Sequence, residues 1–130
     1  MSIIADTDVL IDFLNGREPS ASRIALELDH GTLATTAVTR FELLAGANST
    51  RQQKLVRALL NAVPALPLDA EGADRAAEVR RALEKRGTPV GTGDSLIAGI
   101  VLANQGVLLT RNTKHLERVR GFRISGRQEE

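Results

Sequence analysis

Acidic side chains recur beside apolar segments in this chain of 130 residues. Asp6 and Asp8 directly follow the apolar run at residues 3–5. Glu42 interrupts an apolar stripe, and Asp94 directly precedes another. Two carboxylates about 4 Å apart repel each other by roughly 1 to 4 kcal/mol in water or near a protein surface, so a cluster must bind protons or a hard cation. Mg²⁺ or Mn²⁺ prefers oxygen ligands, so these acids, if they converge, indicate metal-assisted chemistry on a phosphate.

Each of these acids also has a purely structural explanation. Asp6 or Asp8 can cap the helix that follows, and one Asp suffices for that. Thr39 and Glu42 fit a capping box, in which the Glu42 carboxylate accepts a hydrogen bond from the Thr39 amide. Asp94, taken alone, is best explained as an N-cap. Caps do not explain why every one of these acids lies beside the end of an expected strand or helix.

Short apolar segments alternate with amphipathic helical patterns, which predicts a parallel sheet covered by helices on both faces. We expect strands near residues 3–5, 32–36, 63–68, 107–109 and 122–124, and helices from the first acids to Leu14 and near 20–29, 38–45, 51–62, 70–86, 95–105 and 113–119. The segment 63–68 is expected at a sheet edge, because Pro64 and Pro67 cannot donate to a strand ladder. Parallel strands present their carboxyl ends at one edge, where the acids and Asn112 would meet.

The composition limits the possible chemistry and indicates one domain over residues 1–125, followed by a loose tail at 126–130. The absence of cysteine excludes thiol catalysis and cysteine-bound zinc, and the only histidines are His30 and His115. Any metal must therefore bind oxygen ligands. The sequence contains neither a run of 18 apolar residues nor a secretory signal pattern, so we expect a cytoplasmic protein without a membrane span.

Basic residues are grouped in two places although the net charge is only +1. The groups are Arg51, Lys54 and Arg57, and Arg111, Lys114, Arg118, Arg120, Arg123 and Arg127. Such groups can be a solvated face or can bind phosphates. With three Phe and no Tyr or Trp, base stacking cannot be a main mode of nucleic-acid binding. Arg111, Lys114 and Arg118 are the best phosphate-binding candidates, because they follow the buried strand at 107–109.

Four motifs carry a resemblance to a known family. They are I-I-A-D-T-D-V-L-I-D at 3–12, T-R-F-E-L-L-A-G at 39–46, G-T-G-D-S-L-I-A-G at 91–99 and L-L-T-R-N-T-K-H-L at 108–116. In this order they resemble the PIN-domain family, in particular the VapC toxins of prokaryotic toxin–antitoxin pairs. The resemblance implies a three-layer α/β/α sandwich with a mainly parallel sheet. It also implies a Mg²⁺- or Mn²⁺-dependent ribonuclease and a partner antitoxin that blocks the site.

By motif position, the resemblance assigns the family's first three acids to Asp6, Glu42 and Asp94. The family often has a fourth acid in the last motif, where this chain offers Asn112 and His115. We therefore expect Asp6 and Asp94 to hold the metal directly. Glu42 would bind it through water or orient the attacking water, and Asn112 would complete the polar ring.

The expected reaction is hydrolysis of an RNA phosphodiester bond, with most of the catalysis coming from electrostatic stabilisation. Asp8 stands where relatives often have Asn, so we expect it to support the site without binding the metal. We also expect a homodimer, which no motif of the sequence specifies.

Two alternatives compete with this interpretation. The segments 6–8 and 93–95 also resemble haloacid-dehalogenase-type phosphatases, in which one Asp is a nucleophile and another a general acid. That family usually has a longer chain with a cap domain and a further Asp near Ala98. The other alternative is a catalytically silent RNA-binding module, whose thermal stability divalent metal would not change. A receiver domain would need an Asp after a middle strand, and the segment 32–36 ends without one.

Overall fold

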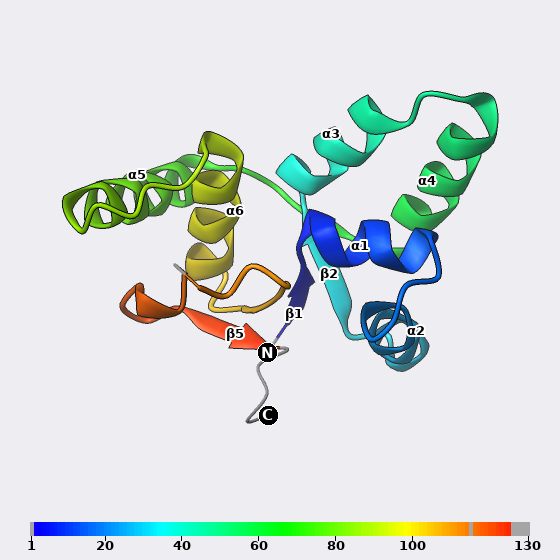
Figure 1. The fold of residues 1–130 in the computed structure, drawn as a ribbon, viewed down its shortest axis with the longest axis horizontal. Coiled ribbons are helices and arrows are strands. Elements are labelled where there is room, and N and C mark those ends of the chain that lie inside the picture. The colour runs from blue at the N-terminus through cyan, green and yellow to red at the C-terminus, as the bar shows by residue number, and fades with distance from the viewer. Residues whose placement is uncertain (1, 115, 126–130) are drawn as a thin grey trace.

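Five short strands form one parallel sheet at the centre of the molecule (Figure 1). The computed structural model describes residues 2–114 and 116–125, so His115 and the predicted tail at 126–130 lie outside the described residues. The strand order is β3-β2-β1-β4-β5, with β1 at Ile3–Ala5, β2 at Leu33–Thr36, β3 at Ala65–Leu66, β4 at Val107–Leu109 and β5 at Arg123–Ser125. The short strand β3 lies at an edge, as its flanking prolines predicted.

Helices cover both faces of this sheet (Figure 1). They are α1 (Thr7–Leu14), α2 (Ser20–His30), α3 (Ala37–Gly46), α4 (Thr50–Ala62), α5 (Ala70–Lys85) and α6 (Thr92–Ala103), with a 3₁₀ turn η1 at Leu116–Arg118. Successive strand residues point to opposite faces. Ala5 and Leu109 accordingly pack in one core with α1 to α4, whereas Ile4 and Leu108 pack in a second core with α5 and α6. The predicted three-layer α/β/α sandwich is confirmed.

The order of the strands explains why distant polar residues meet. The chain forms β2 on one side of β1 and later places β4 on the other side, so the carboxyl ends of β1 and β4 lie next to each other. Ala5 is in register with Leu109, and the Asp6 amide donates to the Leu109 carbonyl at 2.9 Å. Asp6 and Thr110 therefore leave the sheet side by side, at the kind of crevice where open α/β sheets bind ligands.

A close helix–helix contact fixes the position of α6 against α5. A Cβ atom at Gly99 would lie 2.3 Å from the Gly72 carbonyl oxygen and 2.5 Å from the Ala76 amide nitrogen. The two backbones can approach this closely only because Gly99 has no side chain. This contact sets the place of the first turn of α6, which carries Asp94.

Two helix boundaries differ from the sequence prediction. Helix α6 begins at Thr92 and has Gly91 as its N-cap, so Asp94 lies inside the first turn and is not a cap. The glycines at 91 and 93 indicated a loop, but extended Gly91 accepts the Ser95 amide at 3.0 Å and starts the helix there. The helix expected at 113–119 is reduced to η1 in the described residues. No helix in residues 2–114 or 116–125 is long and apolar enough to cross a membrane.

Candidate active site

Asp6 is a buried carboxylate at the junction of β1 and α1, with an exposed fraction of 7%. It caps α1 by accepting the Thr7 amide at 2.8 Å, and its other oxygen accepts the Thr110 hydroxyl at 2.7 Å. Burial raises the pKa of Asp6 to about 6, and the charges of Asp8 and Asp94 add to the increase. The hydrogen bonds from Thr7 and Thr110 lower the pKa of Asp6, because they favour its charged form, but burial outweighs them. Asp6 is therefore a helix cap in a buried position that also lies near other negative charges.

Asp8 ties the start of α1 to the segment that follows β4. One carboxylate oxygen accepts the Val9 amide at 2.7 Å, and the other accepts the Arg111 amide at 3.0 Å. The Thr110 hydroxyl lies 3.2 Å from the second oxygen. These bonds engage both oxygens of Asp8 with the protein itself, as the bonds from Thr7 and Thr110 engage both oxygens of Asp6. The supporting role expected for Asp8 stays a prediction.

Glu42 is connected to the first acids by Thr7. Helix α3 begins at Ala37, and its N-cap Thr36 accepts the Thr39 amide at 3.0 Å. This excludes the capping box of Thr39 and Glu42, since Thr39 lies inside the helix. The Glu42 carboxylate instead accepts the Thr7 hydroxyl at 2.5 Å. Sequence reasoning missed Thr7, although its position between Asp6 and Asp8 was the available signal.

Asp94 is half-buried in the first turn of α6. Burial raises the pKa of Asp94, and the charges of Glu42 and Asp8 raise it further. A Cβ atom at Gly93 would lie 3.0 Å from a carboxylate oxygen of Glu42, so Glu42 faces this turn directly. Asp6, Asp8, Glu42 and Asp94 thus act electrostatically on one another and form one group, called here the acid cluster.

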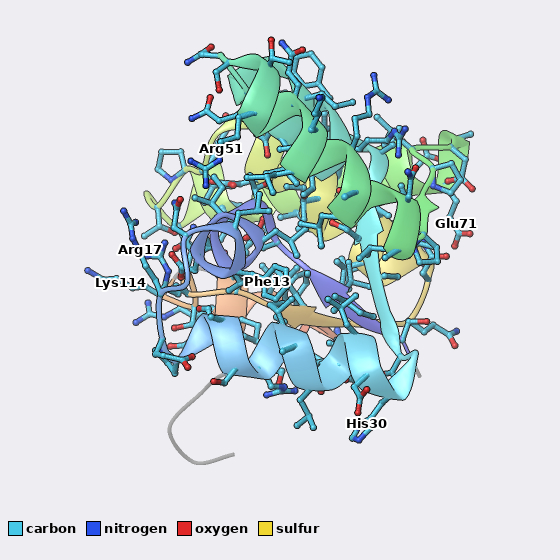
Figure 2. All side chains as sticks on the ribbon, turned by 90° about the vertical axis from the view of Figure 1, so that its right-hand side faces the viewer. Phe13, Arg17, His30, Arg51, Glu71 and Lys114 are labelled. Atoms are coloured by element: carbon cyan, nitrogen blue, oxygen red, sulfur yellow. The ribbon has the colours of Figure 1, made fainter. Side chains whose placement is uncertain are left out.

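The remaining predicted residues lie on the segment after β4. Asn112 is exposed, and its amide donates to the Thr110 hydroxyl oxygen at 3.0 Å. Lys114 and Arg118 are exposed as well, and Lys114 projects outward from the edge of the molecule (Figure 2). His115 lies outside the described residues. The structure therefore brings Asp6, Glu42 and Asp94 together and leaves the basic candidates on the adjoining surface.

Arg111 forms an ion pair that the sequence did not indicate. Its Nε atom lies 2.7 Å from one oxygen of Asp12, and Nη2 lies 3.3 Å from the other. Asp12 has an exposed fraction of only 5%. Burial alone would raise the pKa of Asp12, but hydrogen bonds from Arg111 and Ser20 and nearby positive charge lower it overall. The available signal was an acid one helical turn after Asp8 on an otherwise apolar helix.

The donors of the acid cluster suit a hard divalent cation. In the described ranges, no three His, Asp or Glu side chains are already arranged as a metal-binding group. The carboxylates offer only oxygen donors, and burial, together with the charges of neighbouring acids, raises the pKa of Asp6 and of Asp94. Mg²⁺ and Mn²⁺ prefer such oxygen ligands and would compensate this charge. Asp6 and Asp94 stay the predicted ligands of the ion.

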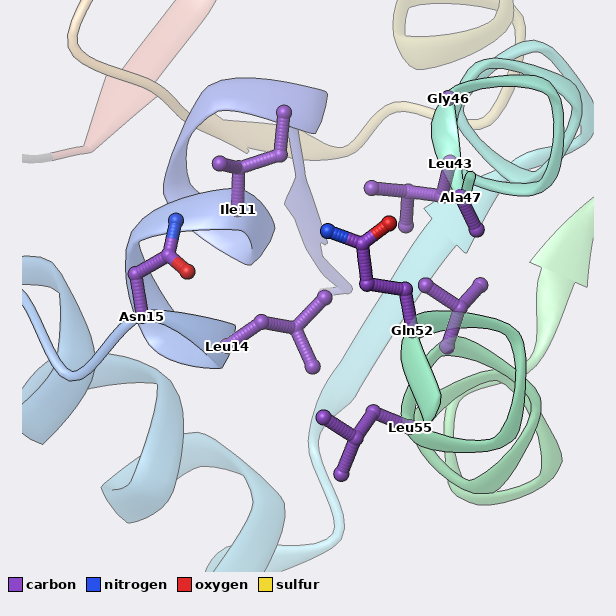
Figure 3. A pocket seen from close by; sticks show the side chains of 9 residues that line it. Ile11, Leu14, Asn15, Leu43, Gly46, Ala47, Gln52 and Leu55 are labelled. Atoms are coloured by element: carbon purple, nitrogen blue, oxygen red, sulfur yellow. The ribbon is translucent and has the colours of Figure 1, made fainter. Parts of the chain in front are cut away.

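Two of the cavities on the described surface lie beside α3. A cavity of about 210 Å³ between α1, α3 and α4 is lined by apolar side chains and the amides of Asn15 and Gln52 (Figure 3). It contains no ionisable lining residue and therefore offers no acid–base chemistry. A cavity of about 440 Å³ between α3 and α6 reaches Glu42 and Gly93. Its rim includes Phe41, which has an exposed fraction of 69%.

Comparisons with known proteins agree with this geometry. A family model described as the PIN domain matches residues 3–121. The tRNA(fMet)-specific endonuclease VapC of Shigella flexneri is 29% identical, covering 95% of this chain and 96% of that protein. Ribonuclease VapC1 of Methanocaldococcus jannaschii is 28% identical, covering 92% of this chain and 82% of that protein.

Solved structures give the same result for the fold. VapBC of Salmonella typhimurium bound to DNA is similar with a TM-score of 0.81 at 28% identity, covering 95% of this chain and 96% of that chain. VapBC2 of Rickettsia felis bound to a DNA fragment from their promoter has a TM-score of 0.84 at 22% identity. That match covers 95% of this chain and 97% of that chain.

Proposed function

Because the chain belongs to the PIN-domain family, we propose that it is a divalent-metal-dependent endoribonuclease and the toxin of a VapBC-type toxin–antitoxin pair. The observation that carries the proposal is the acid cluster at the carboxyl edge of the sheet. There, burial and mutual charge raise the pKa of both Asp6 and Asp94. The similar proteins of Shigella flexneri and Methanocaldococcus jannaschii, an endonuclease and a ribonuclease by name, support the reaction class.

The residues of the cluster would have distinct roles in cleavage. Asp6 and Asp94 would hold Mg²⁺ or Mn²⁺, which when bound would lower the pKa of a water and stabilise negative charge on a phosphoryl oxygen. Thr7 holds the Glu42 carboxylate in place, where Glu42 would bind the metal through water or orient the attacking water. Asn112 would add a polar group at the exposed rim. No histidine or cysteine nucleophile is required.

The substrate and partner follow from the same family relation. We propose RNA as the substrate, held mainly by contacts from Lys114 and Arg118 to its phosphates. We propose a cognate antitoxin as the protein partner, since the solved relatives include VapBC complexes. Because it would act on cellular RNA, we propose a cytoplasmic location for the protein. The homodimer remains a prediction.

Membership of the PIN-domain family removes the phosphatase alternative and leaves the silent RNA-binding module as the competitor. The test is an RNA cleavage assay with metal-free protein, with and without Mn²⁺, using wild type and a folded Asp94→Asn variant. The nuclease proposal predicts cleavage that requires Mn²⁺ and is lost in Asp94→Asn. Binding of RNA without cleavage at any Mn²⁺ concentration would support the silent module instead.

A further inference from the structure

The segment after β4 is held against α1 and its N-cap Asp6 by an ion pair and by hydrogen bonds. The Arg111 guanidinium contacts both oxygens of Asp12, at 2.7 and 3.3 Å. The Arg111 amide donates to Asp8 at 3.0 Å, and the Thr110 hydroxyl donates to Asp6 at 2.7 Å. The Asn112 amide in turn donates to the Thr110 hydroxyl oxygen. Arg111 thus anchors the segment that carries Thr110 and Asn112 beside the acid cluster.

Arg111 is poorly placed to leave this position for a phosphate. Asp12 lies almost completely buried on α1, beside the apolar core. Without the guanidinium, the Asp12 carboxylate keeps only the hydrogen bond from Ser20 and the nearby charge of Arg17. The loss costs less stability than in a fully buried ion pair, because the Arg111 side chain is 58% exposed. The ion pair is bidentate, and this geometry fixes the direction of the Arg111 side chain as well as its distance.

We propose that Asp12 and Arg111 are positioning residues, whose ion pair holds Thr110 and the Arg111 amide against Asp6 and Asp8. The inference rests on the proposed function, because it concerns the same acid cluster. The ion pair fixes the course of the segment 110–112. That course allows the Thr110 hydroxyl to donate a hydrogen bond to Asp6. In the proposal, this hydrogen bond orients the Asp6 carboxylate for metal binding. Arg111, expected from the sequence to bind phosphate, acts here through the protein and not through RNA.

The test compares Asp12→Asn, Arg111→Ala and the double variant with wild type. Loss of a group that orients a metal ligand typically weakens metal affinity by about 10- to 100-fold. We expect each single variant to weaken Mn²⁺ binding by about tenfold in calorimetry of the metal-free protein. The Mn²⁺ affinity of the double variant should be no lower than that of the single variant that binds Mn²⁺ more weakly, because both changes break the same contact. It also removes both charges, so it remains informative if Arg111→Ala alone fails to fold.

A matched control is the ion pair of Arg23 and Glu27 on α2, with a distance of 3.0 Å and a similarly shielded acid. Arg23→Ala should lower the melting temperature without changing Mn²⁺ affinity. The proposal would be overturned if folded Asp12→Asn and the folded double variant both bound Mn²⁺ with the affinity of wild type.

Two readouts separate this proposal from its alternatives. Amide hydrogen exchange at Arg111 and Asn112 should become faster in Asp12→Asn than in wild type, whether or not the protein cleaves RNA. Unchanged exchange would contradict the positioning role, whereas a wild type that neither binds Mn²⁺ nor cuts RNA would contradict the proposed function. The second readout is a salt titration of RNA binding. If Arg111 contacted a phosphate, Arg111→Ala would lower the slope of log K against log salt by about 0.7, and Asp12→Asn would not. Positioning predicts the same slope in Asp12→Asn, Arg111→Ala and wild type.

Discussion

Asp6 makes the stability of the metal-free protein depend on pH. Its pKa is about 6 in the folded state, against an ordinary value of 3.8. Between these values the folded protein binds a proton that the unfolded chain has already released. A raised folded pKa stabilises the protein at low pH, and this stability is lost as the pH rises through about 4 to 6. A shift of this size corresponds to at most about 3 kcal/mol.

Asp6→Asn should remove this dependence. Asn is as good an N-cap as Asp, so α1 keeps its cap while the buried charge disappears. In urea unfolding with a chelator, the variant should be more stable than wild type near pH 7, by at most about 3 kcal/mol, and the difference should vanish near pH 4. An equal difference at both pH values would show that Asp6 is not the titrating group.

Glu42 should matter for activity far more than for stability. Glu42→Gln keeps an oxygen that can accept the Thr7 hydroxyl but removes the charge that faces Asp94. We expect Mn²⁺-dependent RNA cleavage to fall by at least about a hundredfold. The melting temperature should stay the same or rise, because a repulsion is relieved.

Ser49→Ala is the matched comparison, since Ser49 caps α4 by accepting the Gln52 amide at 3.1 Å. Loss of that cap should cost about 1 kcal/mol of unfolding free energy and leave activity unchanged. If Glu42→Gln lowers stability as Ser49→Ala does and keeps its activity, Glu42 has only a structural role.

At the scale of whole elements, the packing of α6 on α5 positions Asp94. Gly99→Ala would force the Cβ atom into the backbone of Gly72 and Ala76. Overpacking of this kind typically costs about 1 to 3 kcal/mol, and we expect metal affinity to fall as α6 shifts. Gly46→Ala is the control, because nothing lies within 4 Å of a Cβ there. Chemical unfolding and Mn²⁺ titration of both variants check this, and equal stability of the two would contradict the close contact.

The elements themselves were largely predictable from the sequence. Apolar runs at 3–5 and 107–109 predicted the central strand β1 and its neighbour β4, and the alternation with helices predicted the parallel sheet. Helix starts were less predictable, because local patterns offered more than one cap. Thr39 and Glu42 matched a capping box, yet Thr36 at the end of β2 was already placed to cap α3. Gly91 and Gly93 suggested a loop, but Gly91 is the N-cap of α6 and Gly93 lies in its first turn.

The candidate site was predictable in its acids and not in the residues that orient them. Asp6 and Asp94 could be identified because each stands beside the end of an element, and Glu42 because it interrupts an apolar stripe. The hydrogen bond from Thr7 to Glu42 joins residues 35 positions apart, and the ion pair of Asp12 and Arg111 joins residues 99 positions apart. Such partners depend on how helices pack, which a single sequence does not specify. The single domain at 1–125 stays a prediction.

At the scale of the whole molecule, the surface charge determines how RNA would be held. Lys114 and Arg118 lie on the segment that leaves the acid cluster, whereas Arg51, Lys54 and Arg57 lie on α4. Each phosphate contact releases counterions, so Lys114→Ala and Arg118→Ala should each lower the slope of log K against log salt by about 0.7 for single-stranded RNA. A salt titration of RNA binding to Asp94→Asn protein measures this without cleavage. A slope that changes only when the α4 residues are replaced would place the RNA on the other surface.

The most direct measurement of the central claim is a calorimetric titration of Mn²⁺ into metal-free wild type, Asp6→Asn and Asp94→Asn. The control is Asp74→Asn, an exposed acid on α5. If the acid cluster holds the metal, wild type and Asp74→Asn bind Mn²⁺ with equal affinity, and binding disappears in the two cluster variants. Binding that survives unchanged in folded Asp6→Asn and Asp94→Asn would contradict the account.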